Sequence, residues 1–235
     1  MVVSHEFLVG FRDVDVNSKM KNSAILNVFQ EIAGFHSIEI GKKFESLDST
    51  WILTGYKVNI IKRPVYGDII NVSTWGTEIK SITAVREFEI RNTSGELLVT
   101  AISNWAHMSN NKLAKVSEET IKAYGLEPEH TNYNELKLKK IMEPETYSIE
   151  NEYVVDWNWI DVNRHMNNIY YMDLADMIMP EQYKLEACNC FEVSYKKEVK
   201  YKEKIKCQYT ELEDSRVVMI KSEDLSKLCA IIKLY

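Results

Sequence analysis

The chain has 235 residues and a formal net charge of −6, from 29 basic and 35 acidic side chains. This length fits one large domain or two smaller ones, and the acidic balance argues against a general nucleic-acid binder. With no apolar stretch near the roughly 20 residues of a membrane span and no secretory signal, we expect a cytoplasmic protein without a membrane partner. Its four cysteines are expected to stay reduced.

The first half of the chain predicts an opening strand, a helix and an antiparallel meander. The apolar stripe of the helix consists of Ile25, Val28, Phe29, Ile32 and then His36 or Ile40. Asn22 or Ser23 is expected to cap its start. Strands are predicted at residues 51–61, 68–77, 85–91 and 97–108, and the last two are joined by a hairpin turn at 92–95.

The second half predicts the same order of elements after a connecting segment. Residues 111–148 are expected to form a linker with one short helix, capped by Ser117 and ended by Gly125. Asn167 or Asn168 then caps a helix that Pro180 ends. Strands are predicted at 190–199, 203–210, 217–221 and 228–235.

An internal repeat links the two halves. The sequence DVNSKMKN, which begins at Asp15, recurs as DVNRHMNN from Asp161, 146 positions later. Because a helix and strands follow each copy, the chain is predicted to be a duplicated α+β domain. The first copy carries Lys19 where the second has His165. This difference suggests that one copy carries catalytic residues and that the other has only a structural role.

Polar residues alternate in the second copy, at Asp161, Asn163, His165 and Asn167, and the segment runs into a helix start. Alternation can place these side chains on one side. Free N–H groups at a helix start can hold a carbonyl oxygen that becomes negative. An imidazole, a carboxylate and amides beside such a site suit hydrolysis of an activated carbonyl. The alternative is a polar loop whose side chains only cap the helix.

Charged residues near the end of the strand predicted at 190–199 form a second candidate. Glu198 is either a catalytic carboxylate or a solvated charge among its lysine neighbours. A basic strip on an acidic chain can steer an acidic partner, although lysines also protect edge strands from aggregation. The strip consists of Lys196, Lys197, Lys200 and Lys202. The five histidines are scattered, so no metal site is expected.

The segment DVNRHMNN at 161–168 resembles the D-x-N-x-H-x-N-N motif of the acyl-acyl carrier protein (acyl-ACP) thioesterases of plants and bacteria. Other segments resemble that family's W-x-L-T, P-x-x-G-D, R-x-F-x-I-R, S-x-W and L-Q-E-x-A-x-x-H motifs. They are WILT at 51–54, RPVYGD at 63–68, REFEIR at 86–91, SNW at 103–105 and FQEIAGFH at 29–36. The likeness covers about residues 5–235.

The resemblance implies a tandem double hot-dog fold, in which two antiparallel sheets each wrap a central helix. It also implies an enzyme of fatty acid biosynthesis that hydrolyses fatty acyl-ACP to free fatty acid and ACP without a cofactor. The implied domains are an acyl-binding N-terminal hot-dog at 1–110, the linker at 111–148 and a catalytic C-terminal hot-dog at 149–235.

By position in the motifs, the resemblance also assigns residues to these tasks. The catalytic groups are expected to be Asp161, Asn163, His165 and Glu198. The expected substrate contacts are Ile25, Phe29, Ile32, Trp51, Thr54 and Asn167. A separate argument from charge concerns the carrier: because carrier proteins are acidic, the basic strip at Lys196, Lys197, Lys200 and Lys202 is the expected docking site for ACP.

One departure from the family bears on mechanism. Plant members often carry a cysteine directly after the glutamate, and this chain has Val199 there. We therefore expect activated water, with Glu198 or Asp161 as general base, His165 in proton transfer and Asn163 orienting water or substrate. The alternatives are an acyl-CoA thioesterase of the hot-dog superfamily and a non-catalytic acyl-thioester-binding hot-dog protein. Either a monomer or a homodimer fits the sequence.

Overall fold

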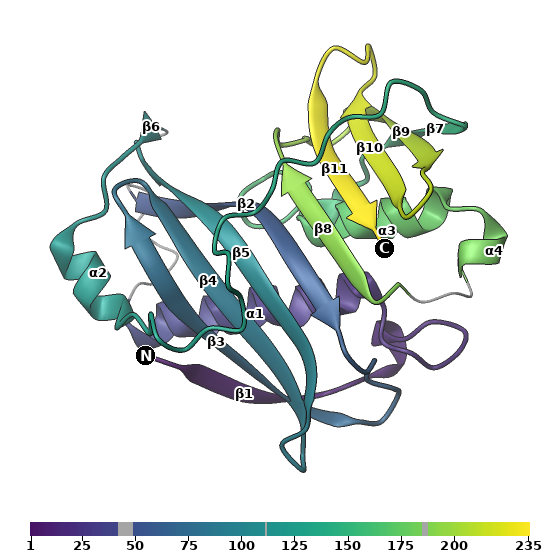
Figure 1. Ribbon diagram of the computed structural model, residues 1–235. Helices are drawn as coiled ribbons and strands as arrows, with labels where there is room; N and C mark the ends of the chain where they lie inside the picture. The colour runs from purple at the N-terminus through teal and green to yellow at the C-terminus, as the bar shows by residue number, and fades with distance from the viewer. Residues whose placement is uncertain (42–48, 111, 185–187) are drawn as a thin grey trace. The chain divides into compact units, whose positions relative to one another are not determined.

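The computed structural model describes residues 1–41, 49–110, 112–184 and 188–235 (Figure 1). The chain divides into two compact units, Met1–Leu138 and Lys139–Tyr235. Each unit packs one principal helix against an antiparallel sheet, so the predicted duplication of an α+β domain is confirmed. No helix in the described part of the chain is long and apolar enough to cross a membrane.

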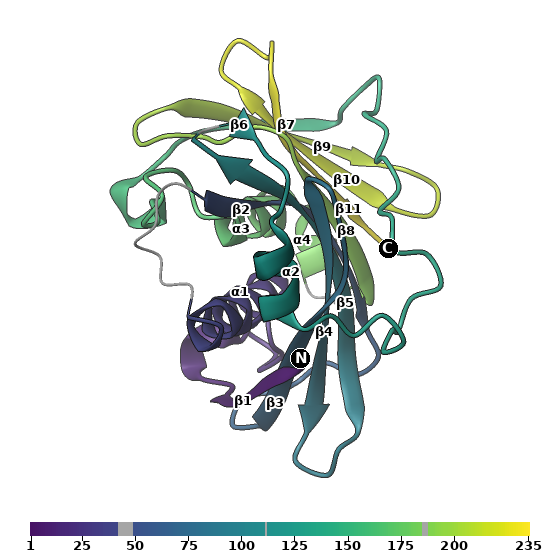
Figure 2. The same ribbon diagram turned by 90° about the vertical axis from the view of Figure 1, so that its left-hand side faces the viewer.

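The first unit orders its main strands β1-β3-β4-β5-β2, and every neighbouring pair is antiparallel. Helix α1 lies along one face of this sheet (Figure 2). The elements are β1 (Val3–Leu8), a 3₁₀ turn (Phe11–Asp13), α1 (Asn22–Glu39), β2 (Ser49–Ile60), β3 (Ile69–Lys80), β4 (Thr83–Asn92), β5 (Leu97–Ser109), β6 (Lys112–Leu113) and α2 (Glu118–Tyr124).

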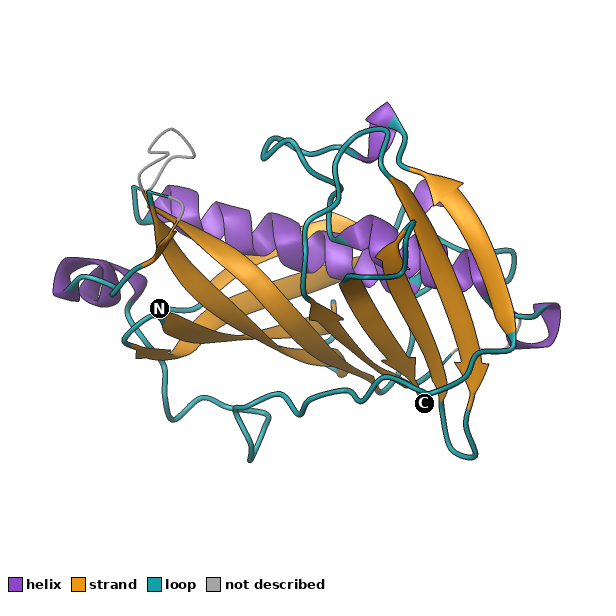
Figure 3. Ribbon diagram, turned by 90° about the horizontal axis from the view of Figure 1, so that it is seen from above, coloured by secondary structure: helices purple, strands orange, loops and turns teal. Residues whose placement is uncertain are grey.

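The second unit repeats this topology with the order β7-β9-β10-β11-β8. Helix α3 lies along one face of its sheet (Figure 3). The elements are β7 (Ile149–Val154), a 3₁₀ turn (Trp157–Trp159), α3 (Ile169–Ile178), α4 (Glu181–Lys184), β8 (Cys190–Tyr195), β9 (Lys204–Glu211), β10 (Arg216–Ser222) and β11 (Leu228–Leu234).

The repeat extends to the register of the strands. Val3 pairs with Thr74 in the first unit, and Ile149 pairs with Tyr209 in the second. The first partners are 146 positions apart, the offset of the repeated motif. The second partners are 135 apart, the offset that also relates Tyr66 to Tyr201. A one-residue slip would turn every side chain of the strand to the other face, so the two units present equivalent positions in the same way.

The apolar stripe predicted for α1 is buried against its sheet. Ile25, Phe29 and Ile32 are fully buried, and the ring of Phe29 lies 4.7 Å from that of Phe88 on β4. The predicted cap is wrong, because Lys21 precedes the helix and no side chain caps it. The amide of Asn22 instead accepts a hydrogen bond from Arg63 at 3.0 Å, a partner that local sequence could not indicate.

Two further predictions of boundaries have different outcomes. Helix α3 ends at Ile178, two residues before Pro180, as expected. Strand β8 ends at Tyr195, so its predicted extension to residue 199 is wrong. The backbone N–H groups of Lys196 and Lys197 both donate to the carbonyl of Cys229. Two successive residues facing one partner end the regular ladder there, which places Glu198 on a turn.

The segment after β5 carries the predicted short helix. Ser117 accepts a hydrogen bond from the N–H of Thr120 at 3.1 Å, and Gly125 ends α2 with φ of +51°. A positive φ is the conformation that favours glycine at this position. Farther along, Ile141 packs on Val217 and its neighbours on β10 and β11.

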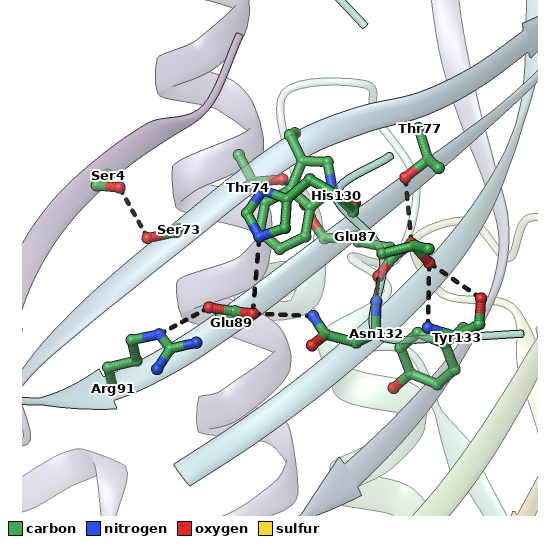
Figure 4. A network of polar contacts seen from close by, with 12 residues as sticks. Ser4, Ser73, Thr74, Thr77, Glu87, Glu89, Arg91, His130, Asn132 and Tyr133 are labelled. Atoms are coloured by element: carbon green, nitrogen blue, oxygen red, sulfur yellow. Dashed lines mark hydrogen bonds and ion pairs between the residues drawn. The ribbon is translucent and has the colours of Figure 1, made fainter. Parts of the chain in front are cut away.

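Two buried carboxylates hold the next part of this segment on β4. Because strand side chains alternate, Glu87 and Glu89 face away from Phe88 and α1. Glu87 accepts hydrogen bonds from Thr131 at 2.6 Å and from the N–H of Asn132 at 2.8 Å (Figure 4). The Asn132 amide also donates to Glu89. These charge-assisted contacts fix the chain after α2 on the first sheet.

A buried polar cluster lies on the α1 side of the same strand. Arg86 donates from Nη1 to His36 Nδ1 and to Thr74 Oγ1, both at 3.0 Å. Because a guanidinium only donates, Nδ1 of His36 accepts and the ring proton sits on Nε2. Burial, and then the charge of Arg86, lowers the pKa of His36 from 6.5 to about 3. His36 is therefore neutral in the folded protein at pH 7.

This cluster predicts a pH dependence of stability. Because the pKa of His36 is lower in the folded state, the unfolded chain takes up the proton first as pH falls below 6.5. The free energy of unfolding should fall between pH 7 and pH 5.5 by about 1 kcal/mol more in the unaltered protein than in His36→Asn. Urea titrations at both pH values measure this difference, and equal falls in the two proteins would contradict it.

Candidate active site

The segment that joins β7 to α3 is a tight turn built around Asp161. Asp161 Oδ1 accepts a hydrogen bond from the N–H of Asn163 at 2.8 Å. The backbone N–H of Asp161 donates to the carbonyl of His165 at 3.0 Å, which closes the turn. Arg164, at its tip, adopts φ of +66°. The Asp161 carboxylate therefore has a structural task within the turn, although it does not cap helix α3.

The turn brings three of the four expected catalytic residues together. His165 Nδ1 lies 3.9 Å from Asp161 Oδ1 and 3.4 Å from the carbonyl oxygen of Met166. Asn163 Nδ2 donates to Asp161 Oδ2 at 3.4 Å. The His165 side chain is 24% exposed and that of Asp161 18%, while Asn163 is exposed. A partly buried imidazole thus stands beside a carboxylate and an amide, open to a ligand from solvent.

Glu198 lies on the neighbouring turn, between β8 and β9. The N–H of Met166 donates to the carbonyl of Val199 at 2.7 Å, and this bond ties the two turns together. The Glu198 side chain is 53% exposed, and its carboxylate lies 3.5 Å from Lys200 Nζ. Within the described residues, no hydrogen bond or ion pair joins Glu198 to Asp161, Asn163 or His165.

The first unit builds the same pair of turns. Asp15 Oδ1 accepts from the N–H of Asn17 at 2.8 Å, and the N–H of Met20 donates to the carbonyl of Pro64 at 2.8 Å. Ser18, the counterpart of Arg164, has φ of +61°. The aspartate, the bond between the turns and the strained tip are therefore features of the repeated scaffold.

The two copies differ in the ionisable side chains that the scaffold carries. His165 stands where the first unit has Lys19, and Glu198 stands where it has Arg63. Arg63 donates to the carbonyl of Met20 at 2.6 Å and thus fixes the start of α1. The second unit has a carboxylate at this position. Only the second unit combines an imidazole and a carboxylate at its two turns.

Tyrosines that the sequence did not single out support the second pair of turns. The buried hydroxyl of Tyr171 donates to the carbonyl of Lys197 at 3.4 Å, and that of Tyr195 donates to the carbonyl of Asn168 at 3.1 Å. Burial raises the pKa of Tyr171, so its hydroxyl stays a donor. Tyr171 follows the D-x-N-x-H-x-N-N motif, but only the fold shows which carbonyl it holds.

The expected substrate contacts already have partners within the protein. Ile25, Phe29 and Ile32 are core residues of the first unit. Asn167 accepts from the N–H of Ile169 at 3.2 Å, as one of the expected helix caps. The ring of Trp51 lies 5.0 Å from that of His107, and Thr54 donates to the carbonyl of Asn104 at 2.9 Å. Their role in acyl binding stays a prediction.

The described residues contain no group of three or more His, Cys, Asp or Glu side chains placed to hold a metal ion.

Comparison with protein families matches both units. Residues 1–124 match the family described as acyl-ACP thioesterase N-terminal domain, and residues 142–231 match acyl-ACP thioesterase C-terminal domain. A chloroplastic acyl-(acyl-carrier-protein) hydrolase of Cuphea viscosissima is 28% identical over 181 residues, which cover 71% of this chain and 44% of that protein. The chain spans about half the length of the curated relatives it matches.

Solved structures confirm the fold class. The 12:0-ACP thioesterase from Umbellularia californica superposes with a TM-score of 0.85 at 19% identity, over 99% of this chain and 96% of that one. A putative oleoyl thioesterase from Lactobacillus plantarum gives a TM-score of 0.84 at 21% identity, over 100% and 95%. The α+β double hot-dog architecture expected from the sequence is therefore confirmed.

The equivalence of the two turns predicts matched effects on stability. Asp161→Ala and Asp15→Ala should each lower the free energy of unfolding by about 1 kcal/mol, because each removes the acceptor for a backbone N–H. His165→Ala should change it by less than about 0.5 kcal/mol, since its contacts are long and partly exposed. Urea unfolding measures all three variants. A cost confined to one aspartate would contradict the shared structural task.

Proposed function

The chain belongs to the acyl-ACP thioesterase family, and on this premise we propose that it hydrolyses fatty acyl-ACP to free fatty acid and ACP. One observation carries the proposal. The chain builds one pair of turns twice, and only the second pair carries both His165 and Glu198. The first unit forms the same turns without these two side chains. Their presence in the second unit is therefore not needed to form the turns, and both can transfer a proton.

Activated water is the proposed nucleophile, with Glu198 as general base. Glu198 is exposed on a turn tied to the His165 turn, whereas Asp161 already accepts the N–H of Asn163. This difference favours Glu198 over Asp161. Water adds to the thioester carbonyl carbon as the base takes its proton, and the C–S bond then breaks. The sulfur leaves as a thiol, and the acyl group leaves as the fatty acid.

His165 and Asn163 are the proposed assisting groups. When His165 Nδ1 carries a proton toward the Met166 carbonyl, Nε2 is left as the ring nitrogen that exchanges protons with substrate or water. The exposed amide of Asn163 is anchored to Asp161, so it can orient the water. Backbone N–H groups at the start of α3 are suited to the carbonyl oxygen as it gains negative charge.

The cysteines of the second unit support a mechanism without a thiolate. Cys188, Cys207 and Cys229 are buried, and Cys190 is partly buried. Burial raises the pKa of the Cys207 thiol to about 12 and that of Cys229 to about 11. Because a thiolate is the nucleophilic form of cysteine, neither of these two is prepared for attack at neutral pH.

We further propose that the first unit binds the acyl chain. Helix α1 has 18 residues against 10 in α3, and its buried face offers the longer apolar surface. Ile25, Phe29 and Ile32 line that face, with Trp51 and Thr54 on the adjoining strand β2. The cytoplasmic location and the homodimer considered from the sequence stay predictions.

Release of free fatty acid from a panel of acyl-ACPs, with matched acyl-CoAs, tests the proposed function. His165→Ala and Glu198→Ala should each lower kcat at least about a hundredfold, because each removes a group that moves a proton. Lys19→Ala, the matched change in the first unit, should keep the unaltered rate. Circular dichroism and thermal unfolding check that the variants fold.

Each alternative gives a distinct result in this assay. Near-normal rates in His165→Ala and Glu198→Ala would contradict the assigned roles. Release from acyl-CoA alone would identify a different thioesterase. Tight binding of acyl thioesters without release would identify a non-catalytic binding protein.

A further inference from the structure

Exposed apolar side chains gather on the two turns of the second unit. Trp157 is 66% exposed and Val162 is 81% exposed, and both lie on the segment that leads to His165. Tyr201, on the neighbouring turn, is also exposed. The rings of Trp157 and Tyr201 meet edge to face, with centroids 5.2 Å apart. The Trp157 and Tyr201 rings therefore form an apolar surface that joins the two turns, and Val162 is exposed on the same turn as Trp157. The two turns, residues 157–164 and 196–202, are here called the second tip.

The first unit exposes apolar side chains at the equivalent positions, here called the first tip. Phe11 is 83% exposed and Val16 is 88% exposed. The ring of Phe11 meets that of Tyr66 edge to face, with centroids 5.9 Å apart. The apolar centre is thus common to both tips, and the difference between them lies in the residues around it.

The second tip carries more positive charge than the first. Residues 157–164 and 196–202 hold five cations, whereas the equivalent residues 11–18 and 61–67 hold three, Arg12, Lys62 and Arg63. The second tip has Lys196, Lys200 and Lys202 at positions where the first tip has Ile61, Val65 and Gly67, and it has Arg164 in place of Ser18. The remaining lysine, Lys197, has Lys62 as its counterpart, and Lys62 forms an ion pair with Glu96.

Several of these cations are available to a partner. Among the described residues, no ion pair involves Lys196, Lys197 or Arg164, all of which are exposed. Lys202 Nζ lies 5.2 Å from the centroid of the Tyr201 ring, so charge and apolar surface are adjacent. Uncompensated cations on a chain of net charge −6 attract acidic partners selectively to this place.

We propose that the second tip is the docking surface for the acidic carrier protein, with Trp157, Val162 and Tyr201 as its apolar centre and the surrounding cations as its rim. The inference rests on the proposed function and adds the surface through which the carrier is recognised. Exposed aromatic and arginine side chains are the types that most often anchor protein interfaces. Arg164 directly precedes His165. A carrier bound here therefore brings the pantetheine arm that bears the acyl thioester close to the proposed catalytic turn. The first tip carries fewer cations around its apolar centre and is not part of the proposed docking surface.

The test compares each change in the second tip with the equivalent or charge-matched change elsewhere. Trp157→Ala is paired with Phe11→Ala, and Lys196→Glu/Lys202→Glu is paired with Lys112→Glu/Lys115→Glu. Lys200 is left in place, because its Nζ is 3.5 Å from Glu198. Each protein is assayed on acyl-ACP and on the same acyl group as a pantetheine thioester. Binding to a bacterial holo-ACP is measured separately at low and high salt.

The proposal predicts that Trp157→Ala and Lys196→Glu/Lys202→Glu each lower kcat/KM on acyl-ACP about tenfold more than on acyl-pantetheine. Both should weaken holo-ACP binding by a similar factor, and the paired controls should not. Salt should weaken binding to the unaltered protein more than to the lysine variant.

Equal effects of Trp157→Ala and Phe11→Ala on holo-ACP binding would overturn the proposal, as would equal effects of the two charge-reversal pairs. Equal losses on acyl-ACP and acyl-pantetheine would also overturn it, because they would mean damage to the catalytic turn. Failure of the proposed function looks different: the unaltered protein would then release no fatty acid from acyl-ACP. The holo-ACP binding assay needs no turnover and tests the surface in that case as well.

Discussion

The turn before the main helix and the turn between two later strands are tied together by backbone hydrogen bonds in both units, and the candidate site is built on this connection. In the first unit the N–H of Met20 donates to the carbonyl of Pro64, and in the second the N–H of Met166 donates to that of Val199. Each bond joins the turn before the helix to the turn between two strands that are distant in sequence. Because it uses only main-chain atoms, the bond leaves the side chains beside it free to change. The scaffold can therefore carry Lys19 and Arg63 in one copy and His165 and Glu198 in the other.

Because these side chains can differ between the copies, one copy can use them to stabilise the fold while the other can use them for catalysis. Arg63 uses its guanidinium to hold the carbonyl of Met20 and the amide of Asn22, so its copy is stabilised at the helix start. Glu198 makes no such bond within the described residues and lies exposed beside Lys200. A group that is not needed to hold the fold is available for a substrate, and its turn also carries the cations proposed to receive the carrier.

The sequence predicts the elements well where local patterns determine them. The repeat, the apolar stripe of α1, the end of α3 before Pro180 and the Ser117 cap follow from periodicity and turn chemistry, and the structure confirms them. Predictions that depended on distant partners were wrong or missing. Asn22 accepts a hydrogen bond from Arg63 instead of capping α1. Strand β8 ends where the N–H groups of Lys196 and Lys197 both donate to the Cys229 carbonyl. In the sequence, Glu87 is one of the polar residues that alternate with apolar ones along a strand. Only the fold shows that its carboxylate accepts hydrogen bonds from Thr131 and Asn132.

The central claim is that the two units share one scaffold and that chemistry depends on two exchanged side chains. Giving the second unit the residues of the first, in His165→Lys/Glu198→Arg, tests it most directly through fatty acid release from acyl-ACP alongside urea unfolding. The account predicts that release falls to background while the free energy of unfolding stays within about 1 kcal/mol of the unaltered value. Continued release from this variant, with the fold intact, would contradict the account.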